Sequence, residues 1–229
     1  MKISICIPTY NRFELTVASF EKVIDDERIA QILIIDDFSN DGSYEKLRFH
    51  FKDNQKVIVV RNKWNVGCLK NKFTSILYST YQWCILLDSD NSIDKDYIDK
   101  IYSFEWDEKT FYQPSFAKPK FDYRHLINIY TKENAKEFLD DELFITMLNT
   151  QNFFVNRKKY VSILNKNEKE VSAADSIYFA YLWLKNGNKI ELVDGLEYNH
   201  LLHDDSLFLN NYTESMNHVN EIKELIRGL

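Results

Sequence analysis

The stretch Cys84-Ile85-Leu86-Leu87-Asp88-Ser89-Asp90-Asn91 runs from four apolar residues directly into two carboxylates one residue apart. The apolar run is too short for a helix and predicts a buried strand. Side chains just beyond the carboxyl end of such a strand lie where open α/β sheets bind ligands. Alternation along an extended chain points Asp88 and Asp90 to the same side. Two hard oxygen ligands can then hold one divalent cation, which can hold a diphosphate.

The sequence before this stretch alternates between strand and helix patterns. Apolar runs predict strands at 2–7, 30–35 and 56–60, and apolar residues at helical spacing predict helices at 13–25, 42–52 and 68–79. Such β-α-β-α-β-α-β alternation predicts a Rossmann-like α/β fold with a mostly parallel sheet and helices on both faces. Three strand ends carry polar side chains, namely Thr9 and Asn11, Asp36 and Asp37, and Asp88 and Asp90.

The second half is less regular. Pro114 predicts that the strand at 110–116 lies at a sheet edge, and Asp194-Gly195 predicts a tight turn between strands at 189–193 and 196–202. A further strand is expected at 151–156. Helices are expected at 94–104, 132–139, 157–164, 174–186 and over roughly the last seventeen residues. Because no Pro/Gly-rich linker interrupts the chain, we expect one domain over 1–229, with functional halves at 1–92 and 93–229.

Composition narrows the class of protein. The formal net charge of −6 over 229 residues argues against nucleic acid as the main partner. The cysteines lack CxxC spacing and are interpreted as buried thiols of a reducing compartment; they are Cys6, Cys68 and Cys84. No segment approaches the roughly 18 apolar residues of a membrane span. We therefore expect a cytoplasmic protein, with association at the inner face of the membrane only through a partner.

The acidic stretch allows two other interpretations. An EF-hand loop starting at Asp88 needs glycine at its sixth position, where this chain has Ile93, and a helix before it, where a strand is predicted. A solvated turn without a ligand stays open as the alternative. The metal–diphosphate site is favoured.

Four segments in this order resemble family 2 glycosyltransferases, which have the nucleotide-sugar-binding GT-A fold. They are Ile5-Cys6-Ile7-Pro8-Thr9-Tyr10-Asn11-Arg12, Ile34-Ile35-Asp36-Asp37-Phe38-Ser39-Asn40-Asp41-Gly42-Ser43, Asn65-Val66-Gly67 with Lys70-Asn71, and Leu86-Leu87-Asp88-Ser89-Asp90. Lys70 stands where the family usually has arginine, and lysine lacks the bidentate fork of arginine. The resemblance spans residues 3–91.

This resemblance implies a metal-dependent inverting transfer of a sugar from a nucleoside-diphosphate sugar, with UDP as the expected nucleotide. The acceptor is expected to be a saccharide or a lipid-linked hydroxyl in surface polysaccharide or glycolipid synthesis. Asp37 would accept from a base N–H, Lys70 would approach the diphosphate, Asp88 would face the ribose or the metal, and Asp90 would ligate Mn²⁺ or Mg²⁺. The full set of expected donor-binding residues is Pro8, Thr9, Tyr10, Asn11, Arg12, Asp36, Asp37, Asn65, Gly67, Lys70, Asp88 and Ser89.

The resemblance also implies a catalytic base in the second half. Asp175 matches the family's helix-start aspartate, with Ala174 where the family usually has glutamate. A plain N-cap role for Asp175 is the alternative, and the acidic pair Asp140-Asp141 is a weaker rival.

Two histidines near the end of the chain are candidate metal ligands. His203, by its spacing to Ser206, matches the family histidine that reaches the metal or the diphosphate. His200 has the opposite strand parity, so we expect only one of the two to face the metal.

Two other classes remain open at this point. A nucleotidyltransferase would carry a Gly- and Arg-rich phosphate loop after its first strand, and the segment 8–12 contains no glycine. A non-catalytic nucleotide-sugar-binding module stays open because Ala174 and Lys70 both depart from the family pattern.

Overall fold

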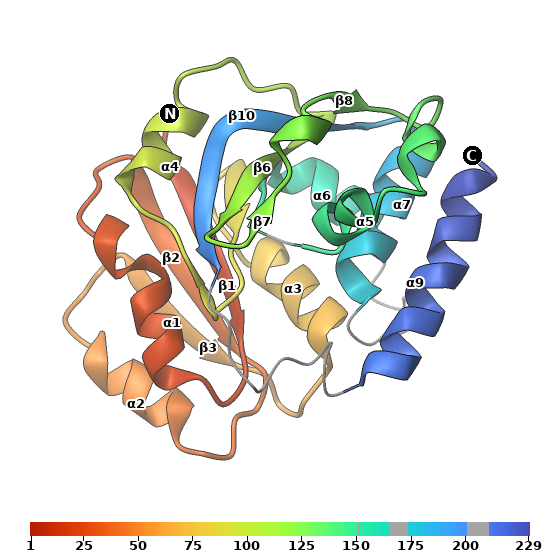
Figure 1. Cartoon of the computed structure of the whole chain (residues 1–229). Helices are drawn as coiled ribbons and strands as arrows, with labels where there is room; N and C mark the ends of the chain where they lie inside the picture. Colours follow the sequence, from red (N-terminus) through yellow and green to blue (C-terminus); the bar gives the residue numbers. More distant parts are fainter. Residues whose placement is uncertain (151, 165–173, 201–210) are drawn as a thin grey trace.

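The computed structural model describes residues 1–150, 152–164, 174–200 and 211–229. These residues form one sheet in the order β3-β2-β1-β4-β9-β6-β10-β5, with β7 paired to β6 and β8 to β10 (Figure 1). The strands are β1 Ile3–Thr9, β2 Ile29–Asp36, β3 Val57–Arg61, β4 Trp83–Leu86, β5 Asn91–Ser92, β6 Thr110–Lys118, β7 Phe121–Asp122, β8 Ile129–Tyr130, β9 Phe154–Asn156 and β10 Lys189–His200.

Helices connect these strands. The α-helices are α1 Phe13–Phe20, α2 Ser43–His50, α3 Cys68–Leu77, α4 Lys95–Ile101, α5 Glu142–Leu148, α6 Arg157–Ile163, α7 Asp175–Lys185 and α9 Tyr212–Arg227. Short 3₁₀ helices are η1 Glu21–Val23, η2 Arg124–Leu126 and η3 Ala135–Phe138. The helix expected at 132–139 is therefore only one 3₁₀ turn.

Strands β3, β2, β1 and β4 form the parallel part of the sheet that the sequence predicts. Their register aligns Thr9 with Asp36, and Asp36 with Arg61, so the polar strand ends meet at one edge. Every residue of β1 is buried, as expected of a strand covered on both faces. Figure 1 shows α1 and α2 on one side of these strands and α3 on the other. The expected α/β fold with a mostly parallel first half is confirmed.

The prediction that the strand at 110–116 lies at an edge is wrong. β6 lies between β9 and β10, pairing antiparallel with the first and parallel with the second. The reason is a bulge in the partner strand: Val193 pairs with Pro114, and the next paired residues are Glu197 and Phe116. The partner ladder is interrupted beside the proline, which has no N–H to offer, so proline is tolerated inside the sheet.

The same bulge corrects the second expectation for this region. β10 is one continuous strand, and Asp194-Gly195 forms no hairpin turn between two strands. Gly195 has φ +73°, the left-handed conformation that glycine adopts readily at a bulge. Turn residues in the sequence thus mark a bulge in a long strand.

An aromatic cluster fixes α6 and α7 against the second half of the sheet. The ring of Phe179 lies 4.4 Å from that of Tyr160 and 5.7 Å from that of Phe153, measured between centroids. The ring of Trp183 is tilted by 55° against that of Phe111, with 5.6 Å between the centroids. Such ring pairs contribute about 0.5–1.5 kcal/mol each beyond their buried area. This packing sets where α7 begins, and Asp175 is its first residue.

Helix α9 packs against α7 at the edge of the molecule, with Val219, Ile222 and Ile226 buried, as its apolar spacing predicts (Figure 1). Within the ranges that the structure describes, no helix is both long and apolar enough to cross a bilayer.

Candidate donor and catalytic site

The loops after β1 and β2 are joined by hydrogen bonds. The backbone N–H of Asn11 donates to Ser39 Oγ at 2.8 Å. Asn11 Nδ2 donates to Asn40 Oδ1 at 3.1 Å, and the backbone N–H of Asn40 donates to Asn11 Oδ1 at 3.0 Å. Asn11 takes φ +53°, a conformation that asparagine tolerates better than most residues. The two loops therefore form one rigid rim at the carboxyl end of the sheet.

Asp36 and Asp37 have different partners. Asp36 is fully buried, where its Oδ2 accepts from the Ser39 N–H at 2.9 Å and lies 3.4 Å from Arg61 Nε. Asp37 holds the loop after β3: its Oδ1 accepts from Asn62 Nδ2 at 2.8 Å and from the Val66 N–H at 2.9 Å. The pair is therefore specialised: Asp36 supports its own turn, and Asp37 reaches the neighbouring loop.

Asp37 has one further bond, because its Oδ2 accepts from the Gly67 N–H at 3.0 Å. Burial raises the pKa of the Asp37 carboxyl above its usual value, against the opposing effect of the bonds from Val66, Asn62 and Gly67. A carboxylate oxygen has two acceptor lone pairs. Oδ1 already has two donors and Oδ2 has one, so Oδ2 is the atom with capacity for a ligand N–H.

The acidic stretch forms a turn. β4 ends at Leu86, and the Asn91 N–H donates back to the Asp88 carbonyl at 3.1 Å. Strand alternation is therefore the wrong explanation for the direction of the two carboxylates, since the backbone turns between them. The turn is anchored from β9's side of the sheet, where Asn152 Oδ1 accepts from the Asp88 N–H at 3.0 Å.

Each of the two aspartates contacts a cation. Arg12 Nη1 lies 2.6 Å from Asp90 Oδ2, which joins the loop after β1 to the end of the acidic turn. Lys72 Nζ lies 3.6 Å from Asp88 Oδ1. The Asp88 side chain is 26 % exposed and the Lys72 side chain only 6 %. Lys72 thus contacts Asp88 from the interior of the protein, whereas Arg12 and Asp90 are both partly exposed.

Lys72 also reaches the second half of the chain. Its Nζ lies 2.6 Å from Asp175 Oδ2, and the Asp175 side chain is 4 % exposed. Burial disfavours the charged form of Lys72, but the charges of Asp175 and Asp88 outweigh it, so the pKa of the ammonium is raised well above its usual value. The two aspartates from opposite halves therefore lie within 3.6 Å of one nitrogen.

This charge arrangement acts on Asp88 itself. Burial raises the pKa of the Asp88 carboxyl. The positive charges of Lys72 and Arg12 oppose that rise, and the negative charges of Asp90 and Asp175 add to it. Gathering several acids favours binding of a cation, because each carboxylate is stabilised by positive charge close by.

The alternatives for the base are resolved in part. The N-cap of α7 is Ala174, without a side-chain cap, so the plain capping role proposed for Asp175 is wrong. Asp141 caps α5, accepting from the N–H groups of Leu143 and Phe144. Asp140 has a side chain that is 97 % exposed, 3.5 Å from Arg227. The rival acidic pair is thus a helix cap and a surface residue.

Of the two candidate histidines, the structure describes His200 alone. His203 lies outside the described residues. His200 ends β10, with its Nδ1 2.9 Å from Asn91 Oδ1, one residue beyond Asp90. Its ring also meets Phe121 edge-on at 5.3 Å.

The acids of the turn suit a divalent cation. In the described ranges no cluster of three or more His, Cys, Asp or Glu side chains is arranged to hold a metal. Mg²⁺ commonly uses only one or two carboxylates together with substrate phosphates and water. Asp88 and Asp90 supply such a pair, so the residues present fit an ion that is completed by a diphosphate.

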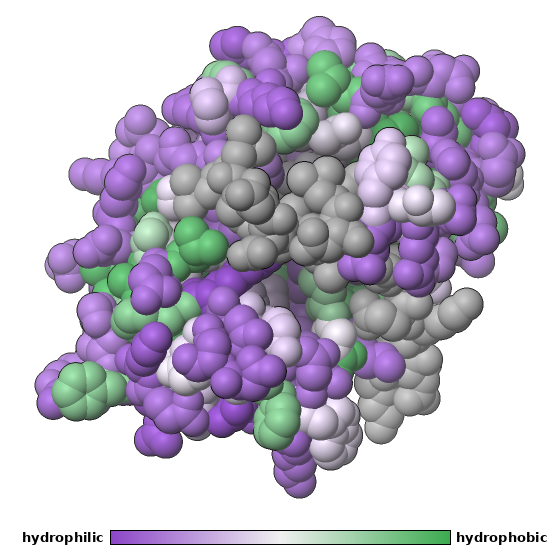
Figure 2. Space-filling view, turned by 60° about the horizontal axis from the view of Figure 1, so that its bottom comes forward, coloured by the Kyte–Doolittle hydropathy of each residue, from purple (hydrophilic) through white to green (hydrophobic). Residues whose placement is uncertain are grey.

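The remaining expected donor-binding residues lie around this edge. They are Pro8 and Thr9, buried at the end of β1, Tyr10, exposed in the next loop, Asn65 and Gly67 in the loop held by Asp37, Lys70 in the first turn of α3, and Ser89, buried between the two aspartates. Figure 2 faces this end of the molecule and shows a hollow near its middle, with hydrophilic residues beside it.

Two residues of the site escaped the sequence analysis. Lys72 had a detectable signal, because it lies three residues after Leu69 and four before Ile76, in the apolar stripe of a helix. A charged residue on a buried stripe is unusual unless it is paired. Asn152 had no comparable signal, since its role depends on the contact between strands β4 and β9.

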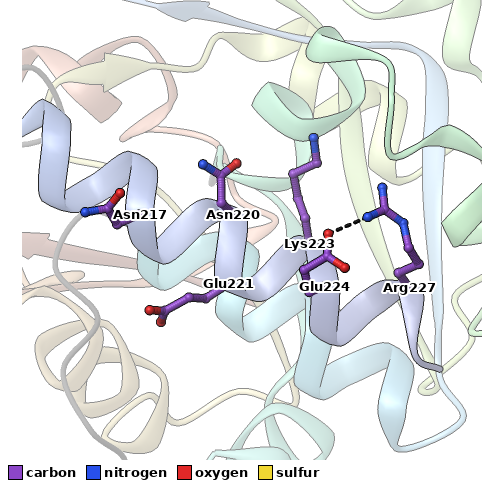
Figure 3. Close-up of a pocket in the computed structure, with 6 residues that line it drawn as sticks. All are labelled: Asn217, Asn220, Glu221, Lys223, Glu224 and Arg227. Carbon is purple, nitrogen blue, oxygen red and sulfur yellow. Dashed lines mark hydrogen bonds and ion pairs between the residues drawn. The ribbon is translucent and has the colours of Figure 1, made fainter.

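A second hollow, of about 630 Å³, lies on α9 and includes none of the expected site residues (Figure 3). Its lining side chains come from one polar helix face and carry both charge signs; they are Asn217, Asn220, Glu221, Lys223, Glu224 and Arg227. Figure 3 shows Glu224 and Arg227 bonded to each other along this face. We do not assign it to the functional site.

Comparisons with known proteins identify the family of the chain. The sequence model of glycosyl transferase family 2 matches residues 4–163. A curated relative is the abequosyltransferase RfbV of Salmonella typhimurium (strain LT2), 32 % identical over 100 residues, which cover 42 % of this chain and 30 % of the relative. The match thus spans less than a third of that enzyme.

Solved structures share the fold. The structure of S. aureus TarS in complex with UDP-GlcNAc superposes with a TM-score of 0.71 at 15 % identity, over 97 % of this chain and 66 % of that one. The mannosyltransferase PcManGT from Pyrobaculum calidifontis, in complex with GDP-Man and Mn²⁺, gives 0.70 at 11 % identity, over 99 % and 69 %. At such identities the likeness shows the GT-A fold alone.

Proposed function

The chain belongs to glycosyl transferase family 2, and we propose that it moves a sugar from a nucleoside-diphosphate sugar to an acceptor hydroxyl with inversion at the anomeric carbon. The observation that carries the proposal is the meeting of Asp88 and Asp175 at Lys72 Nζ. A donor-side carboxylate and a base candidate from the other half of the chain thereby lie at one place. We further propose that residues 1–229 act as one domain, with 1–92 binding the donor.

Donor binding is supported by the strand ends. The rim formed by Asn11 and Ser39 and the Oδ2 lone pair of Asp37 suit a nucleoside, whose base offers N–H donors. UDP is the proposed nucleotide, in line with the UDP-GlcNAc complex of TarS. The diphosphate would lie toward Asp88 and Asp90. Arg12, held at the same turn, supplies a guanidinium of the kind that binds phosphate.

Metal binding is proposed for the same acids. Asp88 and Asp90 would hold Mn²⁺ or Mg²⁺, with His203 as a further candidate ligand. Such an ion, when bound, neutralises charge on a leaving nucleoside diphosphate. PcManGT, of the same fold, was solved with Mn²⁺ and GDP-Man.

Asp175 is the proposed general base. Its carboxylate accepts the proton of the acceptor hydroxyl as the hydroxyl oxygen attacks the anomeric carbon. The bond from that carbon to the diphosphate oxygen breaks on the opposite side, and the electron pair leaves with the nucleoside diphosphate. One base and one displacement give inversion. The first turn of α7 also favours a carboxylate, through the positive end of the helix dipole.

The acceptor is proposed to be a saccharide or lipid-linked hydroxyl, reached at the membrane through a partner. The relation to an abequosyltransferase supports a sugar-transfer role. The second candidate, a non-catalytic nucleotide-sugar-binding module, keeps its support from Ala174, which stands where the family usually has a second acid.

A thermal-shift panel of UDP-, GDP-, CDP- and dTDP-sugars, each with and without Mn²⁺, tests the donor site. Ligand at 100 times its Kd stabilises by about 2.7 kcal/mol, so the matching donor should raise Tm by about 5 °C or more. The shift should require Mn²⁺ and should vanish in the double variant Asp88→Asn/Asp90→Asn. Absence of any shift would contradict the proposed donor site. A shift without donor hydrolysis or transfer would favour the binding module.

A further inference from the structure

Lys72 is a buried lysine that belongs to neither the sequence motifs nor the proposed chemistry. It projects from α3, which follows β3, and its ammonium contacts one carboxylate from each half of the chain. The contact to Asp175 Oδ2 is short, at 2.6 Å, and that to Asp88 Oδ1 is 3.6 Å. A lysine ammonium has three N–H donors, so one nitrogen can serve both acids.

Stability alone is a weak reason for this lysine. Buried ion pairs can often be replaced by apolar residues of similar volume without loss of stability. Position 72 lies on the apolar stripe between Leu69 and Ile76, where an apolar side chain would pack well. The lysine instead places a positive charge where Asp88 and Asp175 would otherwise repel each other.

Two other polar side chains lie near Lys72, Asp88 and Asp175, namely Arg12 and Tyr160. Arg12 contacts Asp90, with its Nη1 2.6 Å from Asp90 Oδ2. The Tyr160 hydroxyl of α6 is also close enough to feel the charges of Lys72 and Asp175, and burial raises its pKa, so it stays neutral. The cation that contacts Asp175 directly, at 2.6 Å from its Oδ2, is Lys72.

We propose that Lys72 is a positioning residue, which fixes the Asp175 carboxylate against the Asp88 end of the donor site. This inference rests on the proposed function, in which Asp175 is the base. Lys72 fixes the rotation of the carboxylate through Oδ2 and holds it near Asp88, so the base lies at a set place relative to the sugar. A displacement of a reacting group by about 1 Å can cost about 100-fold in rate.

A double-mutant cycle tests the proposal with the full chain. The variants are Lys72→Met, Asp175→Asn, the double variant Lys72→Met/Asp175→Asn, and Lys72→Arg. Each is assayed for kcat and for the donor KM, with the nucleotide sugar and Mn²⁺ identified by the thermal-shift panel. UDP affinity in the presence of Mn²⁺ is measured by calorimetry, and Tm by thermal unfolding.

We expect Lys72→Met to lower kcat about 100-fold, with donor KM and UDP affinity within about threefold of the parent protein. Because Lys72 acts through Asp175, the double variant should be no slower than Asp175→Asn alone. Lys72→Arg, which keeps the cation, should recover part of kcat. The double variant removes both charges, so its Tm should exceed that of Lys72→Met; it therefore stays measurable if the single variant folds poorly.

Two results would overturn the inference: a Lys72→Met protein with normal kcat, or rate losses that multiply in the double variant. A fall in Tm with unchanged kcat would reduce Lys72 to a structural ion pair. The proposed function fails separately, if Asp175→Asn itself transfers at the normal rate.

Discussion

The two halves of the molecule place their functional groups by different means. In residues 1–92, Asp37 and Asp88 follow strands β2 and β4, which flank β1 in a parallel ladder, and backbone N–H groups help to hold the loop beside Asp37. In residues 93–229, Asp175 lies at the start of a helix that aromatic packing fixes, and a lysine from the first half contacts it. Backbone geometry sets one part of the site, and packing and charge set the other.

This difference predicts which side chains of the site keep their position when a neighbouring residue is substituted. Groups at strand ends keep their direction as long as the sheet forms, because main-chain bonds fix the loops. Asp175 contacts a lysine from another helix, so its position depends on the packing that brings the two side chains together. Substitutions in the first half should therefore act mainly on donor binding, and substitutions around Asp175 should act mainly on turnover.

The largest expected effect comes from Asp175→Asn. The amide keeps the shape but cannot accept the acceptor's proton, so turnover should fall about 10³-fold. Donor affinity should stay within twofold, because the proposed donor contacts belong to the first half. Steady-state kinetics and calorimetry on the same samples check this. Asp140→Asn, at an exposed aspartate of the same half, is the matched control and should transfer normally; equal losses in both variants would remove the basis for Asp175 as the base.

Asp90→Asn should come next. Losing one of two carboxylates weakens the metal–diphosphate contact, so kcat/KM should fall about 100-fold, with weaker donor affinity contributing to the loss. Calorimetric titration with and without Mn²⁺ measures it. The difference from the parent protein should shrink when Mn²⁺ is omitted; a loss of turnover with intact metal-dependent affinity would move Asp90 out of donor binding.

A smaller effect is expected of Asn62→Ala. Asn62 Nδ2 bonds Asp37 Oδ1 at 2.8 Å and Asn71 Oδ1 at 3.0 Å, so its loss frees the loop after β3. Two lost bonds of about 1 kcal/mol each set an upper limit of roughly 30-fold on the loss of donor affinity, with nearly unchanged kcat. Asn186→Ala, at the far end of α7, is the control. Unchanged affinity would show that this loop does not shape the donor site.

The smallest effect concerns stability. Asn152 has φ +81° and accepts the Asp88 N–H. Asn152→Gly loses that bond, whereas Asn152→Ala loses the bond and also keeps a strained backbone, at about 1 kcal/mol more. Urea unfolding should therefore rank the parent protein first, glycine second and alanine last. Equal stabilities of the two variants would show that the backbone relaxes at this position.

The same contrast explains what could be predicted from the sequence. Strand ends in the first half could be predicted because short apolar runs followed by Asp36-Asp37 or Asp88-Ser89-Asp90 carry their own signal. The alternation argument for Asp88 and Asp90 failed, since hydrogen bonding within the turn decides their direction. Local sequence patterns predicted the strands and helices. The geometry of the turn depends also on Asn152, which is distant in the sequence.

The second half resisted prediction for physical reasons. Pro114 and Asp194-Gly195 look like an edge and a hairpin until the bulge between β6 and β10 brings them together. Lys72 is far from Asp175 in the sequence, and only the packing of α3 near α7 makes them partners. Asn152 meets Asp88 through an antiparallel strand pair that no short pattern announces.

The anomeric configuration of the product tests the central claim most directly. Proton NMR of the first turnover, with the donor identified by the thermal-shift panel, follows the coupling constant of the anomeric proton before the product can equilibrate. A single base at Asp175 and one in-line displacement predict a product of opposite anomeric configuration to the donor. A product with retained configuration would contradict the account, because it requires an intermediate or a same-face attack that one general base does not provide.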